Sequence, residues 1–301
     1  MAPAGCLEAA AAAFHFGADA VYTGLKLFSA RARAQNLTLD EFHELVGYAH
    51  AQTPPRRVFL TLNTLIPEAE LPELIRTLYQ LQDSLPDAII VQDLGTAKLI
   101  RTVLPQVPLH ASTQMAIRNA EGIQLLKTIG FERIILAREL TLAQLKHIRQ
   151  QHPDIELEVF IHGALCYAWS GQCLLSAIAC GESGNRGQCR YICRERFQPL
   201  PLQNQCPGND ESARYLFSMK DLELGPSVRE LVATGIDSLK IEGRKKSPQY
   251  VAAVTAYYRA ILNGQTSTGE LEAIRSDLQT IFSRPTTKFF LGTGKKDRAT
   301  P

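Results

Sequence analysis

The sequence has no long apolar run and little net charge, and both absences narrow the class of protein. No stretch of about 18 apolar residues occurs, so a membrane-spanning helix is not predicted. The first residues, MAPAGCLEAAAAAF, lack the basic segment of a secretory signal peptide. A formal net charge of +2 over 301 residues gives no overall attraction to nucleic acid. We therefore expect a cytoplasmic protein with no membrane partner, and any contact with nucleic acid would have to come from a local patch.

Several catalytic and metal-binding motifs are also missing. The chain has no G-x-S-x-G nucleophile elbow, no H-E-x-x-H helix and no G-x-x-x-x-G-K-[ST] phosphate loop. The paired C-x2-C knuckles of common zinc sites and the C-x2-C-x2-C run of bacterial ferredoxins are absent as well. Hydrolysis by a familiar catalytic triad is therefore not predicted.

What the sequence does contain is an alternation of short β-branched runs with amphipathic helical stretches, which is typical of βα units around a parallel sheet. Seven runs read as strands, at residues 20–24, 58–63, 88–93, 109–113, 133–139, 157–163 and 238–243. An eighth strand is expected just before Ala4, truncated because the chain begins where that strand should be ending. Eight units predict an α/β fold, a (βα)8 TIM-like barrel, with an open doubly wound sheet as the alternative.

Helix starts and domain limits can be read between these strands. Thr38 with Glu41 and Thr141 with Gln144 match the capping box, and Ser247 before Pro248 opens a helix. The barrel is expected to cover residues 1–263, with an insertion at 164–236 after strand 7. Residues 264–301 are polar and poorly periodic, so we expect a tail or the start of a missing C-terminal domain. Because the loops after the strands carry the chemistry of a barrel, the insertion should lie over its mouth.

Five of the seven cysteines fall between Cys166 and Cys193. Cys166, Cys173, Cys189 and Cys193 would make a complete set of four thiolate ligands, spaced C-x6-C-x15-C-x3-C. Thiolates suit both iron-sulfur clusters and zinc, and the spacing by itself also leaves buried free thiols open. Glycines at positions 163, 171, 181, 184 and 187 favour a loop that can bend these thiolates inward.

Arginines crowd the same segment, at Arg186, Arg190, Arg194 and Arg196. Four thiolates bound to iron leave a negative centre, which nearby guanidinium groups would stabilise, and the same groups could hold phosphates. A solvated basic loop is the alternative, because short charge runs usually face water.

Polar side chains stand where the predicted strands end: Asn63, Gln92 with Asp93, His110, Ser112 with Gln114, Arg138 with Glu139, His162, and Lys240 with Glu242 and Arg244. The C-terminal ends of barrel strands line the mouth, so we expect these groups to converge. The expected substrate-binding residues for a carboxylate or phosphate are Asn63, Arg138, Lys240 and Arg244. The catalytic candidates are His110, Gln114, His162 and Glu242. A lone histidine at a strand end is more often a structural residue, and that alternative stays open.

The stretch EVFIHGALCYAWSGQCLLSA is followed by GNRGQCRYICR. Together they resemble the signature of the U32 family, the collagenase-like peptidases of unassigned catalytic type. Further pieces agree in order, namely APAG, GADAVYTG, FSARA, VFLTLNT, LHASTQ, ILARELTL, SMKDL and DSLKIEGR. The chain is most similar to the branch needed for 5-hydroxycytidine in 23S ribosomal RNA, with tRNA-uridine and ubiquinone hydroxylation proteins as relatives.

The resemblance implies a barrel with an oxygen-sensitive 4Fe-4S cluster, whose four ligands map onto Cys166, Cys173, Cys189 and Cys193, with Cys206 as a rival. It also implies prephenate, a small dicarboxylate, as a co-substrate, which Arg138, Lys240 and Arg244 would suit. We therefore expect an iron-sulfur enzyme that supports oxygen-independent hydroxylation of an RNA base, first of all a cytidine in 23S rRNA. An unpaired or flipped base would stack near Tyr167, Trp169 or Tyr191, unless these are core residues.

Three other functions stay open at this point. The first is tRNA-uridine hydroxylation. The second is a collagenase-like peptidase, for which the residues offer no identifiable nucleophile. The third is a non-catalytic, zinc-stapled scaffold that binds RNA or a partner protein.

Overall fold

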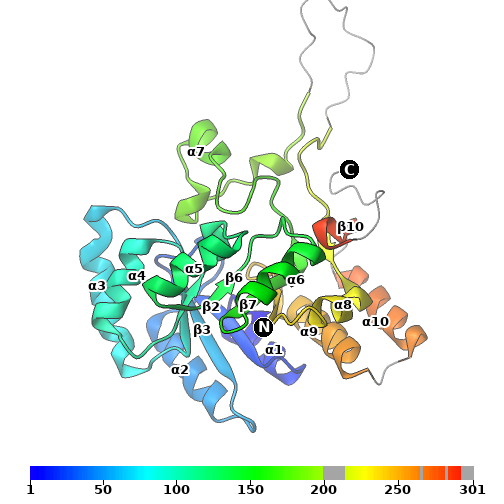
Figure 1. Ribbon diagram of the computed structural model, residues 1–301, viewed down its shortest axis with the longest axis horizontal. Helices are drawn as coiled ribbons and strands as arrows, with labels where there is room; N and C mark the ends of the chain where they lie inside the picture. Colours follow the sequence, from blue (N-terminus) through cyan, green and yellow to red (C-terminus); the bar gives the residue numbers. More distant parts are fainter. Residues whose placement is uncertain (199–213, 265–266, 282–283, 293–301) are drawn as a thin grey trace, which may run out of the picture.

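Parallel strands surrounded by helices dominate the computed structural model, which describes residues 1–198, 214–264, 267–281 and 284–292 (Figure 1). The strands are β1 (Ala2–Pro3), β2 (Ala20–Gly24), β3 (Arg57–Leu62), β4 (Ala88–Val91), β5 (Leu109–Ala111), β6 (Phe131–Ile135), β7 (Glu156–Ala164), β8 (Asp221–Glu223), β9 (Ser238–Ile241) and β10 (Thr286–Thr287). The α-helices are α1 (Leu7–His15), α2 (Leu39–His50), α3 (Leu71–Gln80), α4 (Leu94–Val103), α5 (Ala120–Ile129), α6 (Leu142–Gln151), α7 (Leu175–Cys180), α8 (Val228–Val232), α9 (Pro248–Asn263) and α10 (Thr268–Ile281). None of these helices combines the length and the apolar character needed to cross a bilayer.

Strand order follows the chain from β1 to β7, and every neighbouring pair is parallel. Strand β9 pairs with the other side of β7, also in parallel. Backbone hydrogen bonds then link β9 to the start of the chain: the Met1 nitrogen donates to the Leu239 oxygen at 2.7 Å, and the Ile241 nitrogen donates to the Met1 oxygen at 3.1 Å. These bonds place β9 beside β1, as the predicted TIM-like barrel requires.

Three helices begin at caps that the sequence predicts. The Thr38 side chain accepts the Glu41 backbone N–H at the start of α2, and Thr141 accepts that of Gln144 at the start of α6. Both predicted capping boxes are confirmed. Ser247 caps α9 directly before Pro248, as expected.

Alternation along each strand separates two apolar regions. Val58 and Leu60 of β3 belong to the large cluster between the sheet and the helices. Phe59, between them, packs with Tyr22 and Phe160 in a second, smaller cluster. Because neighbouring strand residues point to opposite faces, this second cluster fills the interior of the ring.

Five predicted strands run past the ends that the structure gives them, so their C-terminal limits were wrong. The backbone leaves the sheet early because polar side chains there form turns. Asp93 accepts the Thr96 backbone N–H and starts α4, while Ser112 accepts the N–H of Gln114 and starts a 3-10 turn, Thr113–Met115. Most of the polar residues expected at strand ends therefore lie in the loops that follow.

The insertion at 164–236 contains structure that the sequence did not indicate. Strand β8 pairs antiparallel with the end of β7, and β10, from the C-terminal segment, pairs with β8. Helix α10 packs along α9 and buries Leu278. The described part of the segment at 264–301 is thus attached to the barrel, and whether it begins a further domain stays a prediction.

Candidate functional site

Residues 166–193, which we call the cysteine segment, lie against the loops at the C-terminal ends of the strands. Two glycines show this. A Cβ on Gly171 would lie 1.9 Å from the Gln114 oxygen, in the loop after β5. A Cβ on Gly187 would lie 2.2 Å from the Ser29 oxygen, in the loop after β2. Both glycines also have positive φ angles, +72° and +77°. The segment therefore lies over the mouth of the barrel, where Figure 1 shows α7 standing clear of the ring.

The four predicted ligand cysteines share one neighbourhood. Burial raises the pKa of the Cys166 and Cys193 thiols, and negative charge on Cys173 and Cys189 raises both further. The four thiols are therefore within electrostatic reach of one another. In addition, the Cys189 Sγ accepts the Tyr191 backbone N–H at 3.4 Å.

Cys180 is exposed on α7, and Cys206 lies outside the described residues. Neither the choice between Cys206 and one of the four nor their role as ligands is tested by these contacts, and the assignment stays a prediction.

The four cysteines have the donor atoms that an iron-sulfur cluster needs, although their side chains are not in the geometry of a metal site. Within the described ranges, no group of three or more His, Cys, Asp or Glu side chains is positioned to hold a metal ion. However, four gathered thiols are the soft donors that iron requires. The Arg138 charge lowers the pKa of Cys166, and the Arg194 charge lowers that of Cys193, each against the larger effect of burial. The residues therefore fit a cysteine-ligated cluster in donor type and neighbourhood.

Arginines surround one carboxylate beside these thiols. The Arg31 Nη2 lies 3.2 Å from the Glu242 Oε1, and the Arg138 Nη2 lies 3.5 Å from its Oε2. Burial by itself would raise the pKa of Glu242, but the charges of Arg31, Arg138 and Arg244 together lower it. Three positive charges against one negative charge leave a surplus of two, which favours an anionic ligand. We call Arg31, Arg138 and Arg244 the mouth arginines.

Arg244 is fixed by its neighbours. Its Nη1 donates to the Ser29 Oγ at 2.7 Å and to the Thr61 Oγ1 at 2.9 Å. Burial lowers the pKa of Arg244 to about 10, so the guanidinium stays charged at neutral pH. Gly24 makes room for it, because a Cβ there would lie 2.6 Å from the Arg244 Nη1.

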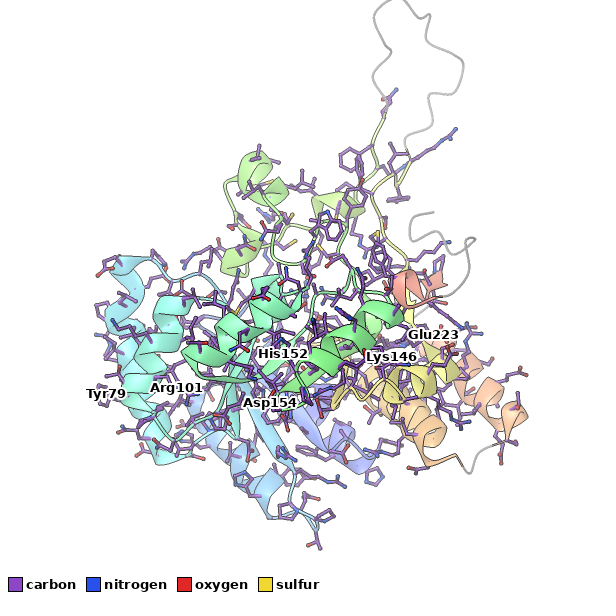
Figure 2. All side chains as sticks on the ribbon, viewed as in Figure 1. Tyr79, Arg101, Lys146, His152, Asp154 and Glu223 are labelled. Carbon is purple, nitrogen blue, oxygen red and sulfur yellow. The ribbon has the colours of Figure 1, made fainter. Side chains whose placement is uncertain are left out.

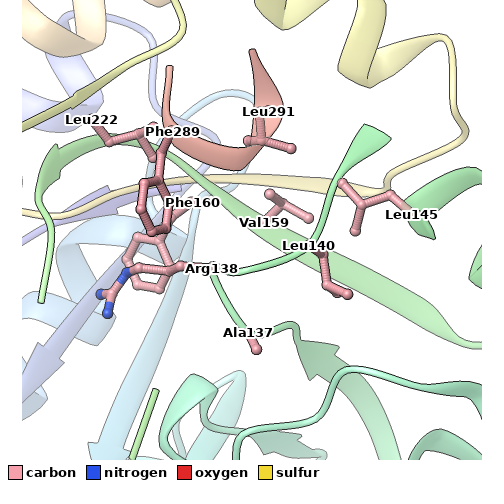
Figure 3. Close-up of a pocket in the computed structure, with 9 residues that line it drawn as sticks. All are labelled: Ala137, Arg138, Leu140, Leu145, Val159, Phe160, Leu222, Phe289 and Leu291. Carbon is pink, nitrogen blue, oxygen red and sulfur yellow. The ribbon is translucent and has the colours of Figure 1, made fainter. Parts of the chain in front are cut away.

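Arg138 is held mainly by packing. Its guanidinium carbon lies 4.2 Å from the centre of the Phe160 ring. Figure 3 shows this guanidinium beside Phe160 and pointing away from Leu140 and Val159. A gap of ≈ 10 Å³ next to it is lined by apolar groups that include Phe289, so the C-terminal segment contributes to this packing.

Two of the predicted residues, Asn63 and Gln114, bind each other. The Asn63 Nδ2 donates to the Gln114 Oε1 at 3.0 Å, while the Asn63 Oδ1 accepts the Ala30 backbone N–H at 3.1 Å. These bonds join the loops after β2, β3 and β5. Both side chains therefore lie at the mouth: Gln114 is in the loop that Gly171 contacts, and Asn63 binds the loop that carries Arg31.

Lys240 lies deeper than expected, inside the ring. Its Nζ donates to the Glu158 Oε1 at 2.9 Å, and Glu158 also pairs with Arg133 at 3.3 Å and accepts the Ser238 hydroxyl at 2.7 Å. Burial would raise the pKa of Glu158, but Lys240 and Arg133 lower it to about 2. Lys240 is thus committed to an internal ion pair rather than displayed to a ligand.

Neither predicted histidine lies among the thiols. His110 packs edge-on against Phe59 inside the ring, and burial, with the charge of Arg133, lowers its pKa to about 3. His162 faces α9, where its Nδ1 lies 3.3 Å from the Tyr258 hydroxyl, and burial lowers its pKa to about 4. Both imidazoles are therefore neutral at physiological pH and packed as structural residues are.

Sequence reasoning missed Arg31 and the groups that position Arg244. Arg31 follows β2 in a loop without strand periodicity, so no strand-end argument selects it. The only signal is the FSARA piece of the family resemblance, which contains Ser29 and Arg31.

A larger cavity of ≈ 660 Å³ opens at the other end of the strands. Its lining includes Arg57, Pro108 and Glu156, which stand at the N-terminal ends of β3, β5 and β7. Figure 2 labels two further lining residues, Arg101 and Asp154. This cavity is therefore remote from the cysteine segment.

Fold and site together define an α/β barrel protein with thiols and surplus arginine charge at the mouth. The chain belongs to peptidase family U32, whose family model matches residues 5–300. The resemblance seen in the sequence is confirmed.

The curated proteins to which this chain is similar have different functional names. A tRNA hydroxylation protein P of Helicobacter pylori is 37% identical over 97% of this chain and 71% of its own length. A 23S rRNA 5-hydroxycytidine synthase of Escherichia coli is 39% identical over 98% of this chain but only 43% of its own length. A protein named collagenase, from Porphyromonas gingivalis, is 31% identical over 94% of this chain and 71% of its own. The chain thus spans less than half of the Escherichia coli relative.

Proposed function

We propose that this protein is an iron-sulfur enzyme that supports hydroxylation of a base in RNA, first of all a cytidine of 23S rRNA. Relatives named for rRNA and tRNA hydroxylation, each more than 30% identical, support the reaction class. The observation that carries the proposal is the meeting of four thiols and surplus arginine charge at one end of a barrel. Among the described residues at the mouth, no serine or cysteine is hydrogen-bonded to a histidine, so a peptidase is not proposed.

Cys166, Cys173, Cys189 and Cys193 would hold a 4Fe-4S cluster. Such a cluster supplies one-electron transfer at a potential that hydrogen bonds and nearby charges adjust. This chain contributes the Tyr191 N–H to the Cys189 sulfur and positive charge near Cys166 and Cys193. These groups stabilise added negative charge at the thiolates.

The mouth arginines would bind a small dicarboxylate, for which prephenate is our candidate. Arg31 and Arg138 reach Glu242 from two sides, and Arg244 is locked in place by Ser29 and Thr61. Because Lys240 is paired with Glu158, Arg31 takes the place that sequence reasoning gave to Lys240.

Calorimetric titration with prephenate tests this assignment. We expect Arg31→Gln to weaken binding by about tenfold or more, since one charged hydrogen bond contributes about 1.5–3 kcal/mol. Unchanged affinity would contradict the assignment.

Metal content tests the cluster. After anaerobic purification we expect brown protein with a broad absorption band near about 400 nm and about four irons per chain. Serine at each of the four proposed ligand positions should remove most of the iron, whereas Cys180→Ser is the matched control and should retain it. Colourless protein with stoichiometric zinc would overturn the cluster.

Mass spectrometry of nucleosides from a deletion strain tests the reaction. We expect one hydroxylated pyrimidine to disappear and to return when the full-length protein or its Cys180→Ser variant is supplied, but not with Cys166→Ser. Separate digestion of ribosomal and transfer RNA shows which RNA is modified. Unchanged hydroxylation in every RNA would reject the proposed function.

A further inference from the structure

Two aromatic rings at the mouth each lie against a cation. The Arg118 guanidinium carbon is 4.5 Å from the centre of the Trp169 ring, and the Lys245 Nζ is 4.7 Å from the centre of the Tyr191 ring. The residues Trp169 and Tyr191 are 52% and 37% exposed. Across the residues that the structure describes, neither Arg118 nor Lys245 forms an ion pair with a carboxylate. Their charges are therefore available to a ligand.

Trp169 is exposed but firmly placed. The next residue, Ser170, donates its backbone N–H to the Glu139 Oε1 at 3.0 Å and its hydroxyl to the same oxygen at 3.2 Å. Gly171 then contacts the loop at Gln114. The Arg118 Nε donates to the Ala116 oxygen at 3.4 Å. An aromatic surface that is already ordered loses little conformational entropy when a ligand binds.

The two pairs flank the thiols from different sides of the ring. Trp169 lies between Cys166 and Cys173 in the sequence, and the Tyr191 N–H binds the Cys189 sulfur. Arg118 follows β5, whereas Lys245 follows β9, and β6 and β7 stand between these strands. Tyr191 also affects the pKa of Arg31 and of Arg244, so it lies near the mouth arginines.

We propose that these pairs form the surface that binds unpaired RNA: one base stacks on Trp169, another on Tyr191, and Arg118 and Lys245 bind flanking phosphates. This inference rests on the proposed function and specifies its substrate as single-stranded or looped RNA. Stacking on an aromatic side chain contributes about 1–3 kcal/mol per base and needs a base that is not enclosed in a duplex. The adjacent cations supply the charge that the RNA backbone requires.

Fluorescence anisotropy with a labelled single-stranded RNA and its duplex tests the stacking. For the anaerobically purified full chain we expect the single strand to bind more tightly. Trp169→Ala should weaken that binding by about 5-fold to 150-fold, which is 1–3 kcal/mol, and Trp169→Phe should keep most of it. Tyr79→Ala on α3 is the matched control, since this ring is 56% exposed and Figure 2 places it far from the cysteine segment.

Salt dependence tests the cations separately. Arg118→Gln and Lys245→Gln should each reduce the slope of log affinity against log salt by about 0.7 for single-stranded RNA. Lys146→Gln on α6, labelled in Figure 2, is an exposed control that should leave the slope unchanged. Because Trp169 is the only tryptophan, quenching of its fluorescence by RNA reports contact at this ring.

Equal affinity of Trp169→Ala and the unchanged chain, with equal unfolding midpoints, would overturn the inference, as would equal affinity for duplex and single strand. If Trp169→Ala unfolds early, Trp169→Phe and the two salt slopes decide. Nucleoside analysis in the deletion strain separates the two proposals. Full hydroxylation by a variant that has lost Trp169 rejects this surface but keeps the enzyme, whereas no hydroxylation by the unchanged chain rejects the enzyme itself.

Discussion

Glu158 shows at the scale of one residue how the barrel tolerates charge in its interior. Its side chain has no exposed surface, yet its carboxylate contacts Lys240, Arg133 and the Ser238 hydroxyl. A buried carboxylate without such partners would lose its hydration with nothing to replace it. The network therefore holds β6, β7 and β9 together from inside the ring.

Replacing Glu158 with glutamine should lower the free energy of unfolding by about 3–5 kcal/mol, because Lys240 and Arg133 are left buried without their counter-charge. Urea unfolding at neutral pH measures this. The exposed pair of Glu73 and Arg76 on α3 is the control, and Glu73→Gln should cost less than about 1 kcal/mol. Equal stability of Glu158→Gln and the original chain would contradict the argument.

The same carboxylate predicts a pH dependence. Its pKa in the folded chain is about 2, below the ordinary 4.5. A lowered pKa stabilises the fold above the ordinary value, and this stabilisation is lost as the pH falls from about 4.5 toward 2. The unfolding free energy of Glu158→Gln should therefore fall less steeply over this range. Identical slopes would show that other groups cause the acid sensitivity.

One sequence shows which residues are crowded into one segment, but it does not show where a side chain near a strand end points. Cysteines crowded into one segment indicate a thiolate site whatever the conformation of the loop that carries them. His162 and Lys240, however, were placed at the mouth because they stand near strand ends. Whether such a side chain meets a ligand, a helix or an internal carboxylate depends on the register of neighbouring strands, which one sequence does not state.

At the scale of an element, the cysteine segment is attached to the barrel through close backbone contacts. Gly171 and Gly181 both have positive φ angles, +72° and +69°. A Cβ on Gly171 would strike the Gln114 oxygen, whereas a Cβ on Gly181 would meet nothing within 4 Å. Comparing substitutions at the two positions therefore distinguishes the effect of backbone strain from the effect of losing the loop contact.

Alanine at position 171 should displace the segment and cause loss of most of the iron after anaerobic purification. Alanine at position 181 is the matched control. It carries the same left-handed strain of about 1–2 kcal/mol but should keep its iron. Iron analysis with thermal unfolding of both variants measures the difference. Full iron content in Gly171→Ala would show that this contact does not position the thiols.

The sequence predicted long elements well and short ones poorly. The starts of α2, α6 and α9 can be predicted from their N-caps, because a cap is a hydrogen bond between residues close in sequence. Strands β8 and β10 have three and two residues and exist only through pairing with each other and with β7. No periodicity can develop over so few residues, so their positions depend on the folded chain.

For the whole molecule, the described part of the C-terminal segment packs against the barrel. Leu278 of α10 and Leu291 are 5% and 6% exposed, and Phe289 packs near Arg138. The barrel limit predicted at residue 263 would remove all of these contacts.

Ending the chain after Asn263 should therefore lower the free energy of unfolding by roughly 3–6 kcal/mol, from the burial of two leucines at about 1.5–3 kcal/mol each. Denaturant unfolding measures the loss. Leu278→Ala should reproduce part of it, about 2–5 kcal/mol, whereas Leu125→Ala on α5 is 60% exposed and should change little. A shortened chain of full stability would instead support the predicted limit at residue 263.

The amino-acid sequence by itself determined the parallel α/β barrel, the starts of α2, α6 and α9 and the gathering of cysteines in one segment. These features depend on interactions between residues near each other in the chain, or on local composition that can be read directly from the sequence. Only the tertiary structure decided that Arg31 joins Arg138 and Arg244 around Glu242, and that Lys240 turns inward to Glu158. Apart from Arg244 and Glu242, which are two residues apart, those partners are separated by tens to hundreds of residues, and only closure of the ring brings their charges together.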